Sequence, residues 1–218
     1  GLISETSGFG QSGRKEILDH AANYGITIVA DEKYGPKDTD ITPQLTALKG
    51  AEGIQAVLIF SGAGTSPSMA VKNYERLGIK LPLYLPHAVV NQEFLKLTGS
   101  ASEGARMPTA IFVVPEAVPD SDPQKPVIDA FYSGYEKTIH EKPSPFAGNS
   151  YDAMLIAIDA IKRARSTDKA KVRQAIEETK NLPGLNGVFT MSPTDHHGLK
   201  VESLQMHVVK DGKFILAK

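Results

Sequence analysis

Residues 1–14 read Gly1-Leu-Ile-Ser-Glu-Thr-Ser-Gly-Phe-Gly-Gln-Ser-Gly-Arg14, which predicts the end of a strand, a glycine-rich turn and the start of a helix. Leu2 and Ile3 are the last apolar residues of that strand. The helix that follows has one apolar face, formed by Ile17, Leu18, Ala21 and Ala22. In open α/β sheets, ligands bind beyond the carboxyl ends of the strands, next to helix N-termini. We therefore expect a binding site at this turn.

Composition narrows the classes of protein to consider. With 218 residues, 41% of them hydrophobic, the chain can bury a core as one large domain or two small ones. Lys and Arg number 24 against 25 Asp and Glu, so the charge balance gives no reason to expect nucleic acid as a partner. The absence of cysteine excludes disulfides and thiolate metal sites. Because the chain opens inside a strand without Met, we expect a fragment that lacks its N-terminal part.

The first half of the chain alternates predicted strands with predicted helices. After the opening strand, apolar runs predict strands at residues 26–30, 56–60, 81–85 and 111–114. The run Ala56–Phe60 is the clearest, since five successive apolar residues are typical of a strand covered on both faces. Ser66 is the expected N-cap of the next helix, with Pro67 at the first helical position. This order predicts an α/β fold, a parallel sheet wrapped by helices.

The second half contains predicted helices with no strand between them. One of these helices has an apolar face formed by Tyr151, Met154, Leu155, Ile158 and Ile161. Such faces have no sheet of their own in this part of the sequence, so we expect them to cover a sheet formed elsewhere. The tail is different, because Asp211-Gly212 between two β-rich runs predicts a hairpin of residues 205–209 and 213–216.

Gly8-Phe-Gly-Gln-Ser-Gly13 also matches the G-x-G-x-x-G pattern of dinucleotide sites, with Asp31 at about the separation of a ribose-binding carboxylate. The alternative function is therefore an NAD-dependent oxidoreductase. Four residues separate the strand from the first glycine, however, and Glu5 among them would place negative charge near the phosphates. The absence of a catalytic motif favours a binding protein over an enzyme, with no cofactor.

Histidines offer two further candidates. Asp195-His196-His197 with His207 could suggest a metal site, but adjacent loop histidines rarely face one ion, so we expect a turn and no metal. His87 follows a predicted strand end and could exchange a hydrogen bond with a ligand there, although a plain surface histidine explains it nearly as well.

Five segments occur in an order that resembles a known family. They are residues 3–13, Lys37-Asp-Thr-Asp40, Ala56–Phe60 with its Gly-Ala-Gly turn, Ala147-Gly-Asn-Ser-Tyr-Asp-Ala153 and Asp211-Gly-Lys-Phe214. Together they are similar to the type I periplasmic solute-binding proteins of the branched-chain amino acid (leucine/isoleucine/valine-binding) family, which serve ABC importers. The resemblance covers nearly the whole chain.

The resemblance implies two α/β lobes that close on a ligand by a hinge. Residues 1–115 would form most of the second lobe, residues 116–197 would supply helices of an incomplete first lobe, and residues 198–218 would return to the second lobe. The expected partners are a small carboxylate ligand, an ABC transporter membrane permease, and either the missing N-terminal part or a second copy of the chain. The implied location is periplasmic, or extracellular with a lipid anchor on the full-length protein.

The resemblance also implies a set of ligand-binding residues: Phe9, Thr65, Ser66 and His87. Phe9 would stack on the ligand's side chain, whereas Thr65 and Ser66 stand where amino-acid binders carry an aromatic residue. His87 stands where they carry an acidic residue for the α-ammonium group. An imidazole pairs poorly with ammonium and well with carboxylate, keto or hydroxyl oxygens. Within the class of small carboxylates (an amino acid or a related aromatic or keto acid), we therefore expect a ligand that is not a standard branched-chain α-amino acid.

Overall fold

The computed structural model describes residues 1–140 and 142–217, which form two compact units. The first unit contains Gly1–Pro108 and the C-terminal segment from Met206 onward, and the second contains Thr109–Gln205. The chain thus leaves the first unit once and returns to it. The sequence prediction placed the two boundaries after residues 115 and 197.

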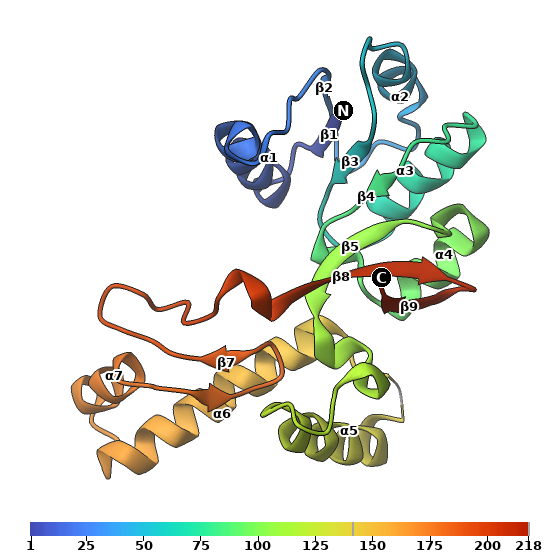
Figure 1. Ribbon diagram of the computed structural model, residues 1–218. Helices are drawn as coiled ribbons and strands as arrows, with labels where there is room; N and C mark the ends of the chain where they lie inside the picture. The colour runs from blue at the N-terminus through green and yellow to red at the C-terminus, as the bar shows by residue number, and fades with distance from the viewer. Residues whose placement is uncertain (141, 218) are drawn as a thin grey trace. The chain divides into compact units, whose positions relative to one another are not determined.

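The first unit is built on a seven-stranded sheet in the order β2-β1-β3-β4-β5-β8-β9 (Figure 1). Every pairing from β2 to β5 is parallel, and β8 pairs with β9 antiparallel. The predicted α/β class is confirmed. The strands are β1 (Leu2–Glu5), β2 (Asp31–Tyr34), β3 (Val57–Phe60), β4 (Leu83–Tyr84), β5 (Arg106–Ala110), β8 (Leu204–Lys210) and β9 (Lys213–Leu216).

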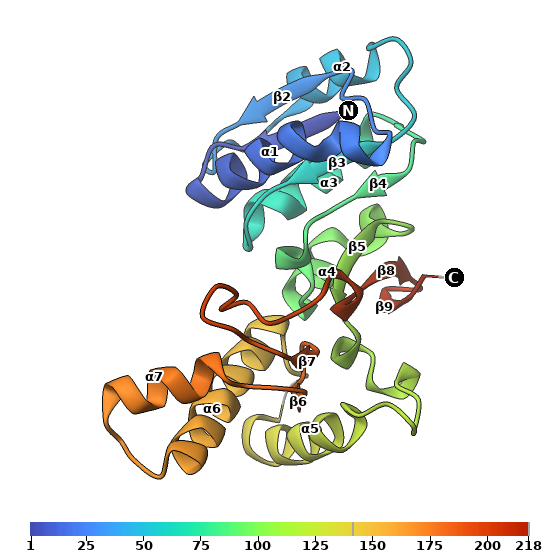
Figure 2. The ribbon, with the colours of Figure 1, turned by 60° about the vertical axis from the view of Figure 1, so that its left-hand side comes forward.

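Helices cover both faces of this sheet. Figure 1 shows α1 on one side, with α2, α3 and α4 on the other, and Figure 2 shows α1 lying along β1 and β3. The core between these layers includes Leu2, Ile3, Leu45 and Ile59, none of which is exposed. The helices are α1 (Gly8–His20), α2 (Thr42–Lys49), α3 (Thr65–Arg76) and α4 (Gln92–Thr98), with short 3₁₀ segments η1 (Ala21–Tyr24), η2 (His87–Val89) and η3 (Gly99–Ser102).

The glycines of residues 8–13 lie inside helix α1, which corrects the prediction of a turn. The hydroxyl of Ser7 accepts a hydrogen bond from the backbone N–H of Gly10 at 3.2 Å and so caps the helix two residues after β1 ends. A Cβ atom on Gly10 would lie well inside the van der Waals distance of the Glu5 backbone oxygen. A Cβ on Gly13 would collide with the Phe60 ring. These glycines let α1 pack closely on β1 and β3.

Two predicted strands are displaced in the structure. The register pairs Leu2 with Asp31, so β2 is Asp31–Tyr34, and the β-rich run at residues 26–30 lies outside the named strands. Residues 111–113 form the 3₁₀ segment η4, and β5 precedes it. Ile111 and Phe112 are nonetheless buried. A short apolar run thus predicts burial more securely than it predicts a strand.

The second unit is mainly helical. Its helices are α5 (Lys125–Ile139), α6 (Pro145–Ala164) and α7 (Lys169–Glu177), with a two-stranded sheet of β6 (Leu182–Pro183) and β7 (Val188–Phe189) and 3₁₀ segments η4 (Ile111–Val113), η5 (Pro115–Ala117) and η6 (Val201–Ser203). Ile156 of α6 packs with Phe189 and Met191 in one cluster. Phe131 of α5 contacts the rings of Phe112 and Tyr151 in another.

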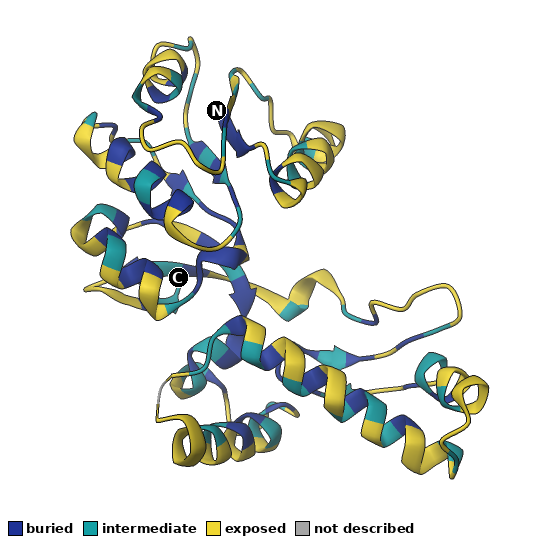
Figure 3. Cartoon of the chain, turned by 180° about the vertical axis from the view of Figure 1, so that it is seen from behind, coloured by how far each residue is buried: buried dark blue, intermediate teal, exposed yellow. Residues whose placement is uncertain are grey.

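Helix α6 also carries apolar side chains that remain exposed, as the yellow stretches of this helix in Figure 3 illustrate. Met154, Ile158 and Ile161 follow one another at helical spacing, and 61% of Met154 is exposed. Phe146, near the start of α6, is also exposed. We call these four residues the α6 stripe. Within the described residues, no helix is long and apolar enough to cross a membrane.

The predicted C-terminal hairpin is confirmed. Val209 pairs with Phe214, and Asp211 and Gly212 connect the strands with φ values of 51° and 67°. Positive φ at both turn residues is the geometry that Asp-Gly favours in a two-residue hairpin.

Candidate functional site

The candidate site lies where β1 and β3 end. These strands are neighbours in the sheet, but their following helices, α1 and α3, cover opposite faces. The loops after β1 and β3 therefore diverge at the carboxyl edge of the sheet. This is the topological switch point at which open α/β sheets bind ligands.

Glu5 joins the two diverging loops. Its side chain is only 5% exposed, and one carboxylate oxygen accepts hydrogen bonds from the Ser7 hydroxyl at 2.7 Å and the Gly62 backbone N–H at 3.2 Å. A carboxylate at this position contributes negative charge and acceptors only. The Glu5 carboxylate lies beside the N-terminus of α1, where a bound pyrophosphate would need hydrogen-bond donors. Its negative charge therefore disfavours a dinucleotide at this position.

The other feature of the dinucleotide pattern, Asp31, is also engaged within the protein. Its carboxylate forms an ion pair with the Arg14 guanidinium of α1, including a hydrogen bond of 2.9 Å from Nε of Arg14. The glycine spacing and Asp31 thus have structural roles in helix packing and in joining α1 to β2.

Phe9 and His87 come together at this edge from positions far apart in the sequence. The Phe9 ring stacks on Phe60, the last residue of β3, with ring centroids 4.9 Å apart and an interplanar angle of 19°. His87, after β4, meets Phe9 edge to face at 5.8 Å. Phe9 remains 39% exposed, so these rings form an aromatic surface that is open to a ligand.

Partial burial within the chain lowers the pKa of His87, although the residue as a whole is exposed. The lowered pKa favours a neutral imidazole near neutral pH. A neutral imidazole offers one donor and one acceptor and can therefore pair with a carboxyl, keto or hydroxyl group.

Ser66 and Thr65 are placed differently from this aromatic pair. The Ser66 hydroxyl is buried and donates a hydrogen bond to the Tyr34 hydroxyl at 3.3 Å. Burial raises the pKa of Tyr34. Ser66 is not the helix N-cap that the sequence predicted, because α3 begins at Thr65 and its cap residue is Gly64, with φ of 106°. Thr65 is exposed and lines a groove on α3.

The structure therefore brings Phe9 and His87 into contact, while Ser66 hydrogen-bonds to Tyr34 instead. Sequence analysis did not assign a site role to Glu5, Tyr34 or Phe60. A positional signal existed for all three, since each is the last residue of a parallel strand.

The chain turns at residues 193–194, and Asp195-His196-His197 follows directly, with both histidines in a bend. The Asp195 carboxylate accepts the backbone N–H groups of His197 at 2.9 Å and Gly198 at 3.0 Å, and these bonds lower its pKa. His196 lies 3.2 Å from a Glu177 carboxylate oxygen. Among residues 1–140 and 142–217, no three His, Cys, Asp or Glu side chains are grouped so as to hold a metal ion.

Comparison with known proteins agrees with this architecture. Residues 1–213 match the family described as periplasmic binding protein. The chain belongs to this family. The predicted relationship to type I periplasmic binding proteins is confirmed.

Individual members of the periplasmic binding protein family are similar to most of the chain. The leucine-, isoleucine-, valine-, threonine- and alanine-binding protein of Pseudomonas aeruginosa is 25% identical over 176 residues, which are 80% of this chain and 44% of that protein. An extracellular ligand-binding receptor from Rhodopseudomonas palustris HaA2 is 28% identical, with a TM-score of 0.89 over 99% of this chain and 62% of the receptor.

The fold is also shared with the branched-chain amino acid transporter substrate-binding protein LivJ from Streptococcus pneumoniae, solved with isoleucine. That protein is 21% identical, with a TM-score of 0.77 over 98% of this chain and 57% of LivJ. The chain thus spans less than half the length of the curated relative and about three fifths of the solved structures.

Proposed function

We propose that the chain is part of the solute-binding component of an ABC importer and that its site holds a small carboxylate, an amino acid or a related aromatic or keto acid. The contact between Phe9 and His87 at the switch point of the sheet carries this proposal. The names of the Pseudomonas protein and of LivJ, which refer to amino acids, support the ligand class.

Each residue of the site has a proposed role. The exposed face of Phe9 packs on the apolar part of the ligand, and Phe60 behind it fixes the ring. His87 donates a hydrogen bond to a ligand oxygen. Thr65 contributes an exposed hydroxyl, whereas Ser66 acts through its bond to Tyr34.

Binding would proceed by hinge closure. A ligand that contacts both lobes of the complete protein favours the closed state by its differential affinity, and the closed protein delivers it to the membrane permease. The family match and the similarity to the extracellular ligand-binding receptor support a periplasmic or extracellular location, and we propose a lipid anchor on the full-length protein. No catalytic role is proposed for any residue.

The His87→Glu substitution should weaken binding of the native acid at least tenfold, because it places a second negative charge beside the ligand carboxylate. His87→Gln, which keeps a neutral donor and acceptor, is the matched control and should lose less. The measurement is a thermal-shift panel of branched-chain and aromatic amino acids, their keto and hydroxy acids, benzoate-type acids and NAD(H). The panel is applied to this chain and to a longer protein that spans the full family length.

A ligand at 100 times its dissociation constant should stabilise the longer protein by about 2.7 kcal/mol. Unchanged affinity in His87→Glu would contradict the role of His87. If NAD(H) were the one compound of the panel that stabilised this chain, the result would favour the oxidoreductase alternative.

We further propose that the α6 stripe is covered in the complete protein by the part of the family fold that this chain does not match. The exposed Met154 and Ile158 and the chain's coverage of its relatives support this. A second copy of the chain would cover the same residues when that part is absent.

This chain on its own should therefore self-associate, and Ile158→Lys should shift it toward monomer. Val201→Lys, which changes an exposed apolar residue outside the stripe, should have no such effect. Light scattering measures the molar mass of all three proteins. A monomeric unsubstituted chain would count against the proposal.

A further inference from the structure

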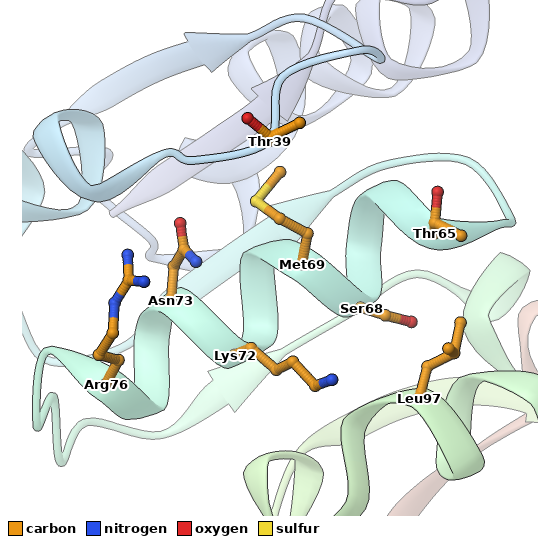
Figure 4. A pocket seen from close by; sticks show the side chains of 8 residues that line it. All are labelled: Thr39, Thr65, Ser68, Met69, Lys72, Asn73, Arg76 and Leu97. Atoms are coloured by element: carbon orange, nitrogen blue, oxygen red, sulfur yellow. The ribbon is translucent and has the colours of Figure 1, made fainter.

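A groove of about 370 Å³ follows the outward face of α3 and lies entirely within the first unit (Figure 4). Its floor is α3 itself, with Ser68, Met69, Lys72 and Arg76 at helical spacing. Thr39 lies on one side of the helix in Figure 4, and Leu97 of α4 lies on the other. Phe9 and His87 do not line the groove, but Thr65, which is also proposed to bind the ligand, does.

The groove carries one positive charge that is not neutralised. Arg76 is engaged by Asp40 at 3.0 Å and by the Thr42 hydroxyl at 2.7 Å. Lys72, one turn before Arg76, is exposed and forms no ion pair within the part of the chain that the structure describes. Its ammonium group is therefore available to an incoming anion.

A second polar group in the groove lacks a partner. Ser68 is only 3% exposed, and its hydroxyl forms no hydrogen bond with any described residue. Buried hydroxyls are nearly always bonded, so an unbonded one at the wall of a groove needs an explanation. Figure 4 shows the side chains of Ser68 and Lys72 directed toward the Leu97 side of the groove.

These two groups match the chemistry of a carboxylate. Ser68 and Lys72 are four residues apart, so a hydroxyl donor and an ammonium donor project from the same face of α3. A carboxylate has only acceptors and binds best to charged and hydroxyl donors. Arg76 adds positive potential nearby, although Asp40 offsets much of it.

The remaining walls favour a peptide over a free anion. Leu97 offers apolar surface on the side of α3 toward which Ser68 and Lys72 point, whereas Met69 points toward Thr39. A small free anion would use the charge and leave this surface uncovered. A protein segment can place an acidic side chain on Lys72 and an apolar side chain on Leu97 together.

We propose that the α3 groove is a docking site for a partner protein that presents an Asp or Glu side chain beside an apolar side chain. Lys72 pairs with the carboxylate, the Ser68 hydroxyl donates to it, and Leu97 contacts the apolar neighbour. The donors of this site, Ser68 and Lys72, are not among the residues proposed to bind the ligand, although Thr65 is common to both sites.

The test is an amide NMR titration of the whole ¹⁵N-labelled chain with N-acetyl-Leu-Glu-amide. N-acetyl-Leu-Gln-amide, which has the same shape without the charge, is the matched probe. We expect shifts around Ser68 and Lys72 that saturate at millimolar concentration, and binding of the Gln probe at least ten times weaker. Lys72→Met should abolish the response, whereas Lys80→Met, which removes an exposed lysine outside the groove, should leave it unchanged.

Ser68→Ala should weaken the Glu probe several-fold with unchanged spectra elsewhere, because it removes one donor and little volume. Equal responses to the Glu and Gln probes would overturn the proposal, as would an unaffected Lys72→Met variant. Glutarate binding as tightly as the peptide would assign the groove to small anions instead. The absence of any shift at about 20 mM probe would exclude a docking role for the groove.

Discussion

Replacing Gly10 by alanine should destabilise the first unit by about 3 kcal/mol or more, because the added Cβ would overlap the backbone oxygen of Glu5. A flexible side chain could move away, but this oxygen belongs to the end of β1 and the helix begins only three residues later. Relief of the overlap would require α1 to shift from the sheet and would disturb the Ser7 cap and the position of Phe9 in the first turn of α1.

Gly8→Ala provides the control, since nothing lies within 4 Å of a Cβ at Gly8. Alanine is the better helix former, so Gly8→Ala should be neutral or stabilising by up to about 1 kcal/mol. Urea unfolding monitored by circular dichroism measures both variants. Equal stabilities of Gly10→Ala and the unsubstituted chain would show that α1 does not pack on β1 as closely as described.

Replacing Asp152 by alanine should destabilise the second unit by about 3 kcal/mol. Asp152 is 3% exposed and lies on α6. Its carboxylate accepts hydrogen bonds from the Leu185 N–H at 2.7 Å, the Asn186 N–H at 2.9 Å and the Asn186 side-chain amide at 2.8 Å. Alanine would leave these donors without their acceptor and release the loop between β6 and β7.

Asp159→Ala is the matched control, because Asp159 also lies on α6 but pairs with Arg163 near the surface at 2.7 Å. Its loss should cost about 0.5 kcal/mol. Scanning calorimetry distinguishes the two variants, and hydrogen exchange at Leu185 and Asn186 should rise only in Asp152→Ala. Similar melting behaviour of both variants would mean that Asp152 is not the anchor of this loop.

The α/β class and the hairpin could be predicted because their signals are local. An Asp-Gly dipeptide between β-rich runs almost specifies its turn, and the continuous apolar run at residues 56–60 marks a buried strand. The run at residues 26–30 was predicted as a strand because its β propensity is high. Pairing with β1, however, begins only at Asp31, opposite Leu2. The glycines of α1 misled it differently, since glycine required by close packing looks the same in sequence as glycine required by a turn.

The candidate site could be predicted only in part. The resemblance supplied Phe9 and His87, and the structure places these residues in contact. The prediction that Phe9, Thr65, Ser66 and His87 bind ligand stays a prediction. Phe60 and Tyr34 were missed because their roles depend on neighbours that are distant in sequence, and Ser66 was taken for a helix cap because Pro67 follows it. The periodicity and spacing of residues in the sequence do not show which side chains of different strands and helices will contact one another.

The division of the first unit between two distant stretches of chain has a consequence for its synthesis. The ribosome completes residues 1–108 first and then adds roughly a hundred residues of the second unit before the strands β8 and β9 exist. At ordinary translation rates this interval lasts on the order of ten seconds. During it, β5 lacks its later neighbour in the sheet and presents an open edge, which is a target for chaperones and a hazard for aggregation. Truncations or fusions at the C-terminus should therefore affect the yield of folded protein more than their distance from the ligand site would suggest.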